Sequence, residues 1–268
     1  MYHGTSRADA GALERQLRMV SIAFPVVPLE ELGKRRGRPR VALTFDDGLR
    51  NNVEVAYPIL RKLGLSATFY VCPGLIDGEQ WLWNHEARQR LLTLGAGELA
   101  ELASHVGAPA EVEGFVEWMK QLPIARRREV EKETRAATPD FSPTDAQRAE
   151  FDLASWKDLK RLDPRVVTLG SHTMTHPILT SLTPEETDGE MRESRVALEK
   201  NLERPVSLFC YPNGNVNEGA LASARRYYRS AVTVEPGTVT CEDDPHLLRR
   251  FAAHPRGMRR LVRRMILG

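Results

Sequence analysis

The chain has 268 residues, 41% of them hydrophobic and 28% charged, which is typical of a globular protein long enough to bury a sizeable core. Its 38 Lys and Arg residues nearly balance 36 Asp and Glu residues, so no overall charge attracts nucleic acid and no nucleic-acid partner is expected. The three cysteines show no CxxC spacing, which argues against a disulfide framework and against a cysteine-built zinc site.

The first twenty residues lack the basic region and apolar run of a secretory signal. No apolar stretch approaches the length of a membrane span. For the chain as given, we therefore expect a cytoplasmic location.

Short apolar runs alternate with amphipathic helical patterns along the chain. Residues 40–45 are an apolar run followed by two acidic residues and a glycine, which predicts a buried parallel strand. Residues 52–63 place their apolar side chains on one helical stripe, and Gly64 supplies a stop. Residues 66–72 are predicted to form the next strand.

A second series begins at residue 166. Strands are predicted at 166–170, 205–211 and 230–234, and helices at 183–202 and 217–228. The longer helix opens with a capping box, Thr183 to Glu186, and has Pro184 at its first position. Strands that alternate with helices imply a parallel sheet, and closure of that sheet into a TIM-like barrel is compatible with the pattern.

Between the two series lies a long helical stretch at about residues 81–162. It is too long for a single crossover connection. We interpret it as a helical insertion near the carboxyl ends of the strands, within a single domain that covers residues 1–268, and not as a separately folding domain.

Two adjacent carboxylates, Asp46 and Asp47, directly follow the first predicted strand in the segment TFDDG. Charges at the end of a buried strand are costly without a positive partner, and a divalent cation would provide one. Adjacent strand residues point to opposite sides, so a turn at Gly48 is needed to bring both carboxylates to one site. One could then bind the ion while the other acts as a base. A helix N-cap is the alternative interpretation.

Two histidines, His172 and His176, follow the strand at 166–170 in the segment SHTMTHP. A spacing of four suits two ligands on a helical turn or compact loop, and neutral imidazole suits zinc, cobalt or nickel. Structural histidines are the alternative. Together with one aspartate they would form an open metal site, in which bound water loses a proton near pH 7 and the second aspartate accepts it. That chemistry hydrolyses acyl bonds.

In this order, TFDDG and SHTMTHP resemble the first two signatures of the NodB-type polysaccharide deacetylases, carbohydrate esterase family 4. Residues 69–71, the helix at 190–202 and the segment FCYPNG at 209–214 follow the family's order. The resemblance covers about residues 20–255, and the insertion matches only loosely. It implies a distorted (β/α) barrel with Asp46 as base and a divalent metal, zinc before cobalt, nickel or manganese, on the ligands Asp47, His172 and His176.

The chain departs from the family pattern at two functional positions. Many members carry an Arg before the Pro of the third signature, where this chain has Cys210; Arg249 resembles a late Arg of exopolysaccharide-type members and is expected to replace it, with a surface Arg as the alternative. The family's late His, a general acid, has two candidates here, His254 and His246, and we favour His254. The fourth signature, which contains Asp and Trp, is not evident.

Four further residues are candidates for substrate contacts or for oxyanion stabilisation. The family suggests that the backbone N–H of Tyr211 stabilises the oxyanion, and Pro212 and Asn213 in the same turn are expected to contact substrate; a structural turn is the alternative. Trp83, at the start of the insertion, is expected to stack on a sugar ring, with core packing as the alternative. Residues 258–267 mix apolar residues with arginines. We expect them to cover the protein's own surface, and contact with a membrane surface is not expected.

The sequence thus predicts a metal-dependent deacetylase that hydrolyses N-acetyl groups on a carbohydrate. A non-catalytic carbohydrate-binding protein on the same scaffold is the second hypothesis. A phosphatase that uses the Asp pair is the third, but it would depend on magnesium, and the two histidines argue against that ion. The sequence names neither the glycan nor the oligomeric state.

Overall fold

Five short parallel strands form one sheet in the order β1-β2-β3-β4-β5. A computed structural model describes residues 1–32, 39–257 and 261 of the chain. The strands are β1 (Leu43–Phe45), β2 (Ala67–Val71), β3 (Val167–Ser171), β4 (Leu208–Cys210) and β5 (Ser230–Val232). Each lies inside or overlaps a run that the sequence predicts as a strand, and the parallel sheet is confirmed.

Two extended segments close the gap between the edge strands, which explains the barrel-like curl. Leu248 pairs in parallel with Val232 of β5, and Tyr2 pairs in parallel with Phe45 of β1. The two segments also bond to each other, because the Met1 amino group donates to the Phe251 carbonyl at 2.7 Å and the Ala253 N–H donates to the Met1 carbonyl at 2.8 Å. The predicted distorted (β/α) barrel is confirmed.

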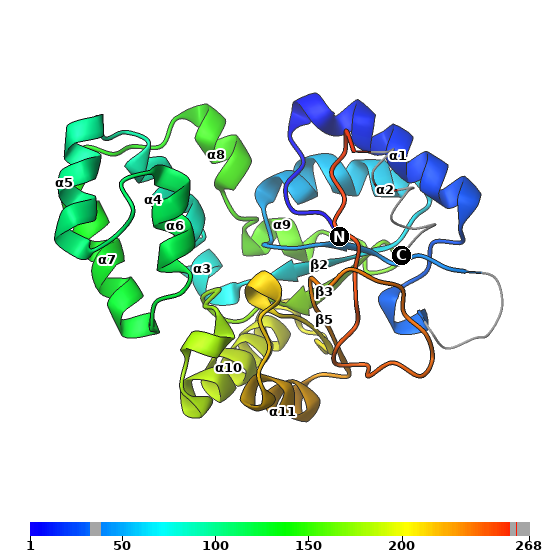
Figure 1. Cartoon of the computed structure of the whole chain (residues 1–268). Coiled ribbons are helices and arrows are strands. Elements are labelled where there is room, and N and C mark those ends of the chain that lie inside the picture. The colour runs from blue at the N-terminus through cyan, green and yellow to red at the C-terminus, as the bar shows by residue number, and fades with distance from the viewer. Residues whose placement is uncertain (33–38, 258–260, 262–268) are drawn as a thin grey trace.

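The helices of the α/β units cover the outside of the curled sheet (Figure 1). They are α1 (Ala10–Ala23), α2 (Tyr57–Leu63) after the π-helical turn η3 (Asn52–Ala56), α10 (Pro184–Leu202) and α11 (Glu218–Tyr227). The predicted capping box is present, since the Thr183 hydroxyl accepts from the Glu186 N–H while the Glu186 carboxylate accepts from the Thr183 N–H. Short 3-10 turns complete this part: η1 (Arg7–Asp9), η2 (Leu29–Glu31), η4 (Leu179–Ser181) and η5 (Pro212–Gly214).

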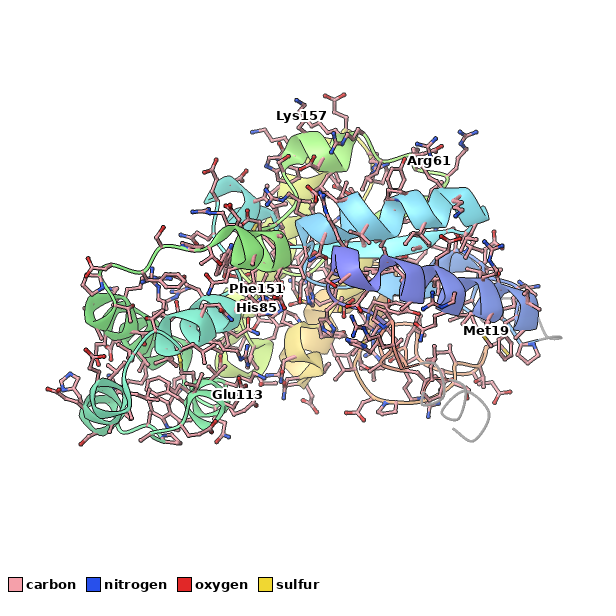
Figure 2. All side chains as sticks on the ribbon, turned by 90° about the horizontal axis from the view of Figure 1, so that it is seen from above. Met19, Arg61, His85, Glu113, Phe151 and Lys157 are labelled. Carbon is pink, nitrogen blue, oxygen red and sulfur yellow. The ribbon has the colours of Figure 1, made fainter. Side chains whose placement is uncertain are left out.

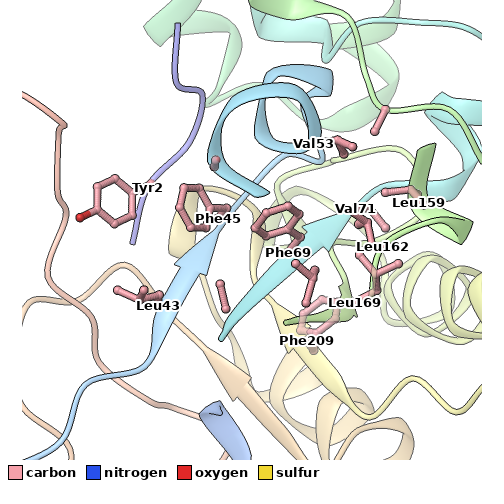
Figure 3. Packing of buried hydrophobic residues seen from close by; sticks show 14 of the residues in the cluster. Tyr2, Leu43, Phe45, Val53, Phe69, Val71, Leu159, Leu162, Leu169 and Phe209 are labelled. Carbon is pink, nitrogen blue, oxygen red and sulfur yellow. The ribbon is translucent and has the colours of Figure 1, made fainter. Parts of the chain in front are cut away.

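Alternate strand residues pack into two different clusters, as the two-residue period of a strand requires. Phe45, Phe69 and Phe209 are at most 1% exposed and pack with the covering helices (Figure 3). Their neighbours Tyr70 and Cys210 belong to a second cluster, on the face that lines the interior of the curl. The residues that follow each strand continue the same alternation, which determines which of their side chains reach the carboxyl edge of the sheet.

The predicted insertion consists of six short helices, and α4 to α7 stand together to one side of the sheet (Figure 1). Its helices are α4 (Trp83–Leu91), α5 (Ala96–Val106), α6 (Val112–Met119), α7 (Ile124–Ala137), α8 (Asp145–Phe151) and α9 (Trp156–Lys160), and the one-turn helix α3 (Pro73–Asp77) precedes them. Helices α4 to α7 share a hydrophobic cluster of their own, which also contains Ile178 from the loop after β3. Ile178 therefore fixes the insertion against that loop.

No helix in the described part of the chain is long and apolar enough to cross a bilayer. The predicted amphipathic stretch at 258–267 falls, apart from Leu261, outside the described residues.

Replacing Phe69 by Ala tests the packing between sheet and helices. The Phe69 ring is 1% exposed and meets the Phe45 ring edge-on with 5.1 Å between centroids, so Phe69→Ala is expected to lower the free energy of unfolding by about 3–5 kcal/mol. Urea denaturation measures it. Ile22→Ala, at a side chain 74% exposed on α1, is the control and should change the value by less than about 0.5 kcal/mol. Equal losses would contradict the assigned core.

Candidate active site

The first acidic pair lies where β1 ends, and the backbone turns there as the sequence requires. Asp47 and Gly48 both have left-handed backbone conformations, with φ of 72° and 67°. A Cβ added at Gly48 would lie 2.8 Å from Cγ1 of Val71, so the turn depends on glycine for space as well as conformation. Both carboxylates are buried, Asp46 at 2% and Asp47 at 5% exposure.

Asp47 meets both histidines. Its Oδ1 is 3.5 Å from Nε2 of His172 and 3.5 Å from Nε2 of His176. The three ligand atoms lie within 4.8 Å of one another. Tetrahedral zinc with bonds of about 2.0–2.1 Å would separate its ligands by roughly 3.4 Å, so the spacing suits atoms that share an ion.

A hydrogen bond of His172 fixes which of its ring nitrogens faces the space between the three ligand atoms. Nδ1 lies 2.7 Å from the Cys210 carbonyl oxygen, and because a carbonyl can only accept, Nδ1 must carry the proton. In the neutral ring Nε2 then presents a lone pair to Asp47. Burial opposes ionisation of Asp47, but the two imidazoles outweigh it and hold the pKa of that carboxyl well below its usual range. Converging lone pairs around a buried anion fit a divalent cation.

The loop that carries the two histidines is held from α10. The Glu190 carboxylate accepts from the N–H groups of Met174 and Thr175, at 2.8 and 3.0 Å, and from the Thr175 hydroxyl at 2.7 Å. Within the loop, the Thr173 hydroxyl accepts the His176 N–H at 3.0 Å. These bonds stabilise a backbone in which Thr173 and His176 both have positive φ, 68° and 56°, a conformation unusual for such side chains.

Asp46 is bound by an arginine, but Arg249 is not that residue. Arg250 donates from two nitrogens to the two Asp46 oxygens, each at 2.8 Å. Burial raises the pKa of Asp46, but the Arg250 charge and hydrogen bonds outweigh burial and lower it to about 2. Asp46 is therefore ionised at neutral pH. Arg250 also contacts Cys210 Sγ at 3.1 Å, the position at which the family's own arginine is missing.

Arg249 was expected to replace the missing arginine, but the next residue, Arg250, occupies that place. Arg249 is half-exposed and pairs with Asp243 at 2.9 Å. Consecutive residues of an extended segment point to opposite sides, and since Arg250 faces the interior, Arg249 must face solvent. The sequence pattern predicts a late arginine correctly in kind but cannot decide which of two neighbours points inward.

Observed contacts also place three other candidates. The Tyr211 N–H, expected to stabilise an oxyanion, already donates to the Val232 carbonyl at 3.2 Å. His254 is exposed, and its ring Nδ1 accepts from the Arg256 N–H. The alternative, His246, has its Nε2 on the Tyr228 carbonyl at 2.9 Å.

Trp83 does not offer a face to a sugar. It is 7% exposed, and the Arg127 guanidinium covers its ring at 4.5 Å from the centroid. Its indole N–H donates to the His176 carbonyl at 3.1 Å. Core packing thus prevails over stacking, and the insertion reaches the histidine loop through this bond. In the β4–α11 turn, Pro212 is buried whereas Asn213 is exposed with φ of 56°.

Two histidines near the acidic pair were not singled out from the sequence. His3 is exposed and follows Tyr2, whose carbonyl accepts the Asp46 N–H at 2.9 Å, so it lies beside the end of β1. His85 packs on Phe151 with 4.9 Å between ring centroids (Figure 2). Burial lowers the pKa of His85 to about 4, so it stays neutral at physiological pH. Tyr2 pairs with β1 through a single bridge. Such a short pairing leaves no periodic pattern in the sequence, so the sequence does not reveal that His3 lies near the site.

A curled parallel β/α sheet with an Asp-His-His centre and a second, ionised aspartate at its carboxyl edge defines a hydrolase of the NodB fold. A sequence model of the family described as "Polysaccharide deacetylase" matches residues 33–231. The chain belongs to this family, and membership implies a hydrolase that acts on amide bonds of polysaccharides.

The relatives agree with that assignment. The chain is 22% identical over 223 residues to "Putative polysaccharide deacetylase YxkH" of Bacillus subtilis, covering 83% of this chain and 54% of the relative; it thus spans about half the length of that curated protein. The fold resembles Streptococcus pyogenes deacetylase PplD in complex with acetate, with a TM-score of 0.65, 20% identity and coverage of 99% and 96%. It also resembles IcaB from Ammonifex degensii, with a TM-score of 0.62, 16% identity and coverage of 98% and 93%.

Replacing each of the neighbouring arginines, Arg249 and Arg250, by lysine in separate variants tests the contact to Asp46. Arg250→Lys keeps the charge but loses the two-point contact, and a hydrogen bond to a charged group contributes about 1.5–3 kcal/mol, so kcat should fall about ten- to a hundredfold. Arg249→Lys, at the exposed pair with Asp243, should leave kcat within about twofold. Steady-state kinetics with measured metal content decides. A larger fall of kcat in Arg249→Lys than in Arg250→Lys would show that Arg249 is the arginine that supports Asp46.

Removing one indole N–H tests how the insertion supports the metal centre. Trp83→Phe keeps an aromatic ring under Arg127 but frees the His176 carbonyl, so zinc affinity should fall about tenfold or more. Competition with a chromophoric chelator measures the affinity. Trp118→Phe, elsewhere in the insertion, where its ring packs against Phe115, is the matched control. Unchanged affinity in Trp83→Phe would show that the bond does not hold the loop.

Proposed function

We propose that this chain is a divalent-metal-dependent deacetylase that removes acetyl groups from N-acetylated, GlcNAc-type sugars of a glycan polymer or glycan intermediate. The observation that carries the proposal is the convergence of Asp47, His172 and His176, with ionised Asp46 beside them. Two imidazoles and a carboxylate with an open position favour zinc, and cobalt, nickel and manganese are the alternatives.

Bound there, a divalent ion would polarise the acetyl carbonyl and acidify a water molecule. Asp46 accepts the proton of the water that attacks the carbonyl carbon. Arg250 keeps Asp46 ionised and aimed, because its two hydrogen bonds fix both carboxylate oxygens. A carbon–oxygen bond forms, the carbon–nitrogen bond breaks, and the products are acetate and a free sugar amine.

The departing amine needs a proton, and His3 is the best-placed donor. It lies beside the end of β1, where its charge acts on both Asp46 and Asp47. Burial holds His85 neutral, whereas His3 is exposed beside both carboxylates. His3 therefore takes the role that the sequence had suggested for His254.

A non-catalytic carbohydrate-binding protein is less well supported than the sequence alone suggested. The missing arginine at Cys210 favours such a protein, but Arg250 supplies a guanidinium to that place. A magnesium-dependent phosphatase is disfavoured because two of the three clustered ligand groups are imidazoles.

Asp46→Asn separates catalysis from metal binding. The amide cannot accept the proton, so turnover should fall at least about a hundredfold, while zinc content stays near that of the wild type because Asp47, His172 and His176 remain. His172→Ala is the matched control and should lose the metal as well. Acetate release from chitooligosaccharides and poly-N-acetylglucosamine, with and without added zinc, measures activity, and elemental analysis measures the metal. A wild-type rate in Asp46→Asn would refute the assignment of the base.

A further inference from the structure

A cavity of about 540 Å³ lies between α1, the segment that leads into β1 and the segments that follow β5. A volume of this size is in the usual range of sites that bind small molecules, about 300–1,000 Å³. The described residues that line it include neither Asp47 nor His172 nor His176. The cavity is therefore a space separate from the candidate metal centre.

Most of the described residues that line the cavity are apolar. They come from α1, from η2 and from the extended segments beside β1 and β5, and they include Val20, Phe24, Leu29, Val239, Leu248 and Leu261. Apolar walls offer water few hydrogen-bond partners, and cavities of this kind hold hydrocarbon in preference to water. The lining therefore favours a ligand with a hydrocarbon body.

The charged side chains in this lining all have the same sign. They are Arg40, Arg249 and Arg250, and no aspartate or glutamate is found among the described lining residues. The whole chain carries almost as many acidic as basic residues, so the composition alone does not explain this one-sided charge. An apolar space with only cations at its walls is complementary to a ligand that joins a hydrocarbon chain to an anionic head.

Two of the three arginines already have partners inside the protein. Arg250 uses its N–H groups on Asp46 and on three neighbouring groups of the interior, and Arg249 pairs with Asp243 at 2.9 Å. The guanidinium of Arg40, which is half-buried, makes no hydrogen bond or ion pair with any residue that the structure describes. Arg40 is therefore the lining arginine that is left to bind an anion.

We propose that the cavity binds a long-chain fatty acid, with its hydrocarbon chain among the apolar side chains and its carboxylate on Arg40. A guanidinium binds a carboxylate through two parallel hydrogen bonds, which makes arginine the preferred partner of such a head. The volume suits one alkyl chain and not the two chains of a phospholipid. The inference is independent of the proposed deacetylase function, because this binding needs neither the metal ligands nor Asp46.

Palmitate and hexadecanol, which share a chain length but differ in the charge of the head, test the role of Arg40. Displacement of a fluorescent fatty acid measures both affinities. The wild type should bind palmitate at least about tenfold more tightly than hexadecanol, and Arg40→Gln should lose that advantage while its affinity for hexadecanol stays unchanged. Arg229→Gln is the matched control and should alter neither affinity. Arg229 is exposed outside the cavity, and its guanidinium likewise has no partner among the described residues.

A blocking substitution tests where the hydrocarbon chain lies. Val239 is half-buried in the cavity wall, in a segment without helix or strand, so Val239→Trp should fill the space and weaken binding of both ligands at least about tenfold. Urea denaturation checks that this variant folds, and the Arg40→Gln comparison decides alone if it does not.

Three results would overturn the proposal: no binding of palmitate by the wild type, the same palmitate affinity in Arg40→Gln as in the wild type, or undiminished binding by a folded Val239→Trp. Vesicles of phosphatidylglycerol separate a single fatty acid from a membrane surface. Binding to these vesicles without binding of dissolved palmitate would also overturn the proposal, in favour of a membrane surface.

Discussion

Two adjacent buried carboxylates at the end of β1 impose the constraint on which the site depends. An unpaired charge in the interior costs several kcal/mol, so each carboxylate needs its own compensation. Asp46 receives it from Arg250, 204 residues later in the chain, and Asp47 receives it from two imidazoles that also suit a cation. The left-handed turn at Asp47 and Gly48 separates these partners, so one carboxylate faces a guanidinium while the other faces two imidazoles with which it could hold an ion.

Contacts from α10 and from the insertion hold the loop that carries the two histidines. Glu190 on α10 holds the histidine loop by three hydrogen bonds, and Trp83 of the insertion holds the His176 carbonyl from the other side. The insertion is therefore part of the active centre. It supports a candidate metal ligand through the bond from the Trp83 indole N–H to the His176 carbonyl.

Cys210 and Arg250 together show how a guanidinium reaches Asp46 although the family's signature arginine is missing. The thiol at 210 is small and fully buried, which leaves space in the interior for a guanidinium that enters from the segment after β5. Arg250 donates to Asp46 and also to the Thr233 carbonyl and the Thr44 hydroxyl, so its position is fixed from the ends of two different strands. The same orienting role is thus filled from another place in the chain.

The sequence by itself determined the alternation of strands and helices, the capping box of α10, and the pairing of TFDDG with SHTMTHP, because periodicity and short motifs are local properties. Only the tertiary structure decided which of Arg249 and Arg250 points inward, that His3 lies beside Asp46, and that Trp83 supports a loop. These outcomes depend on which face of an extended segment meets the interior, and on pairings between residues up to about two hundred positions apart. A register shift of a single residue reverses such an outcome without changing any local pattern.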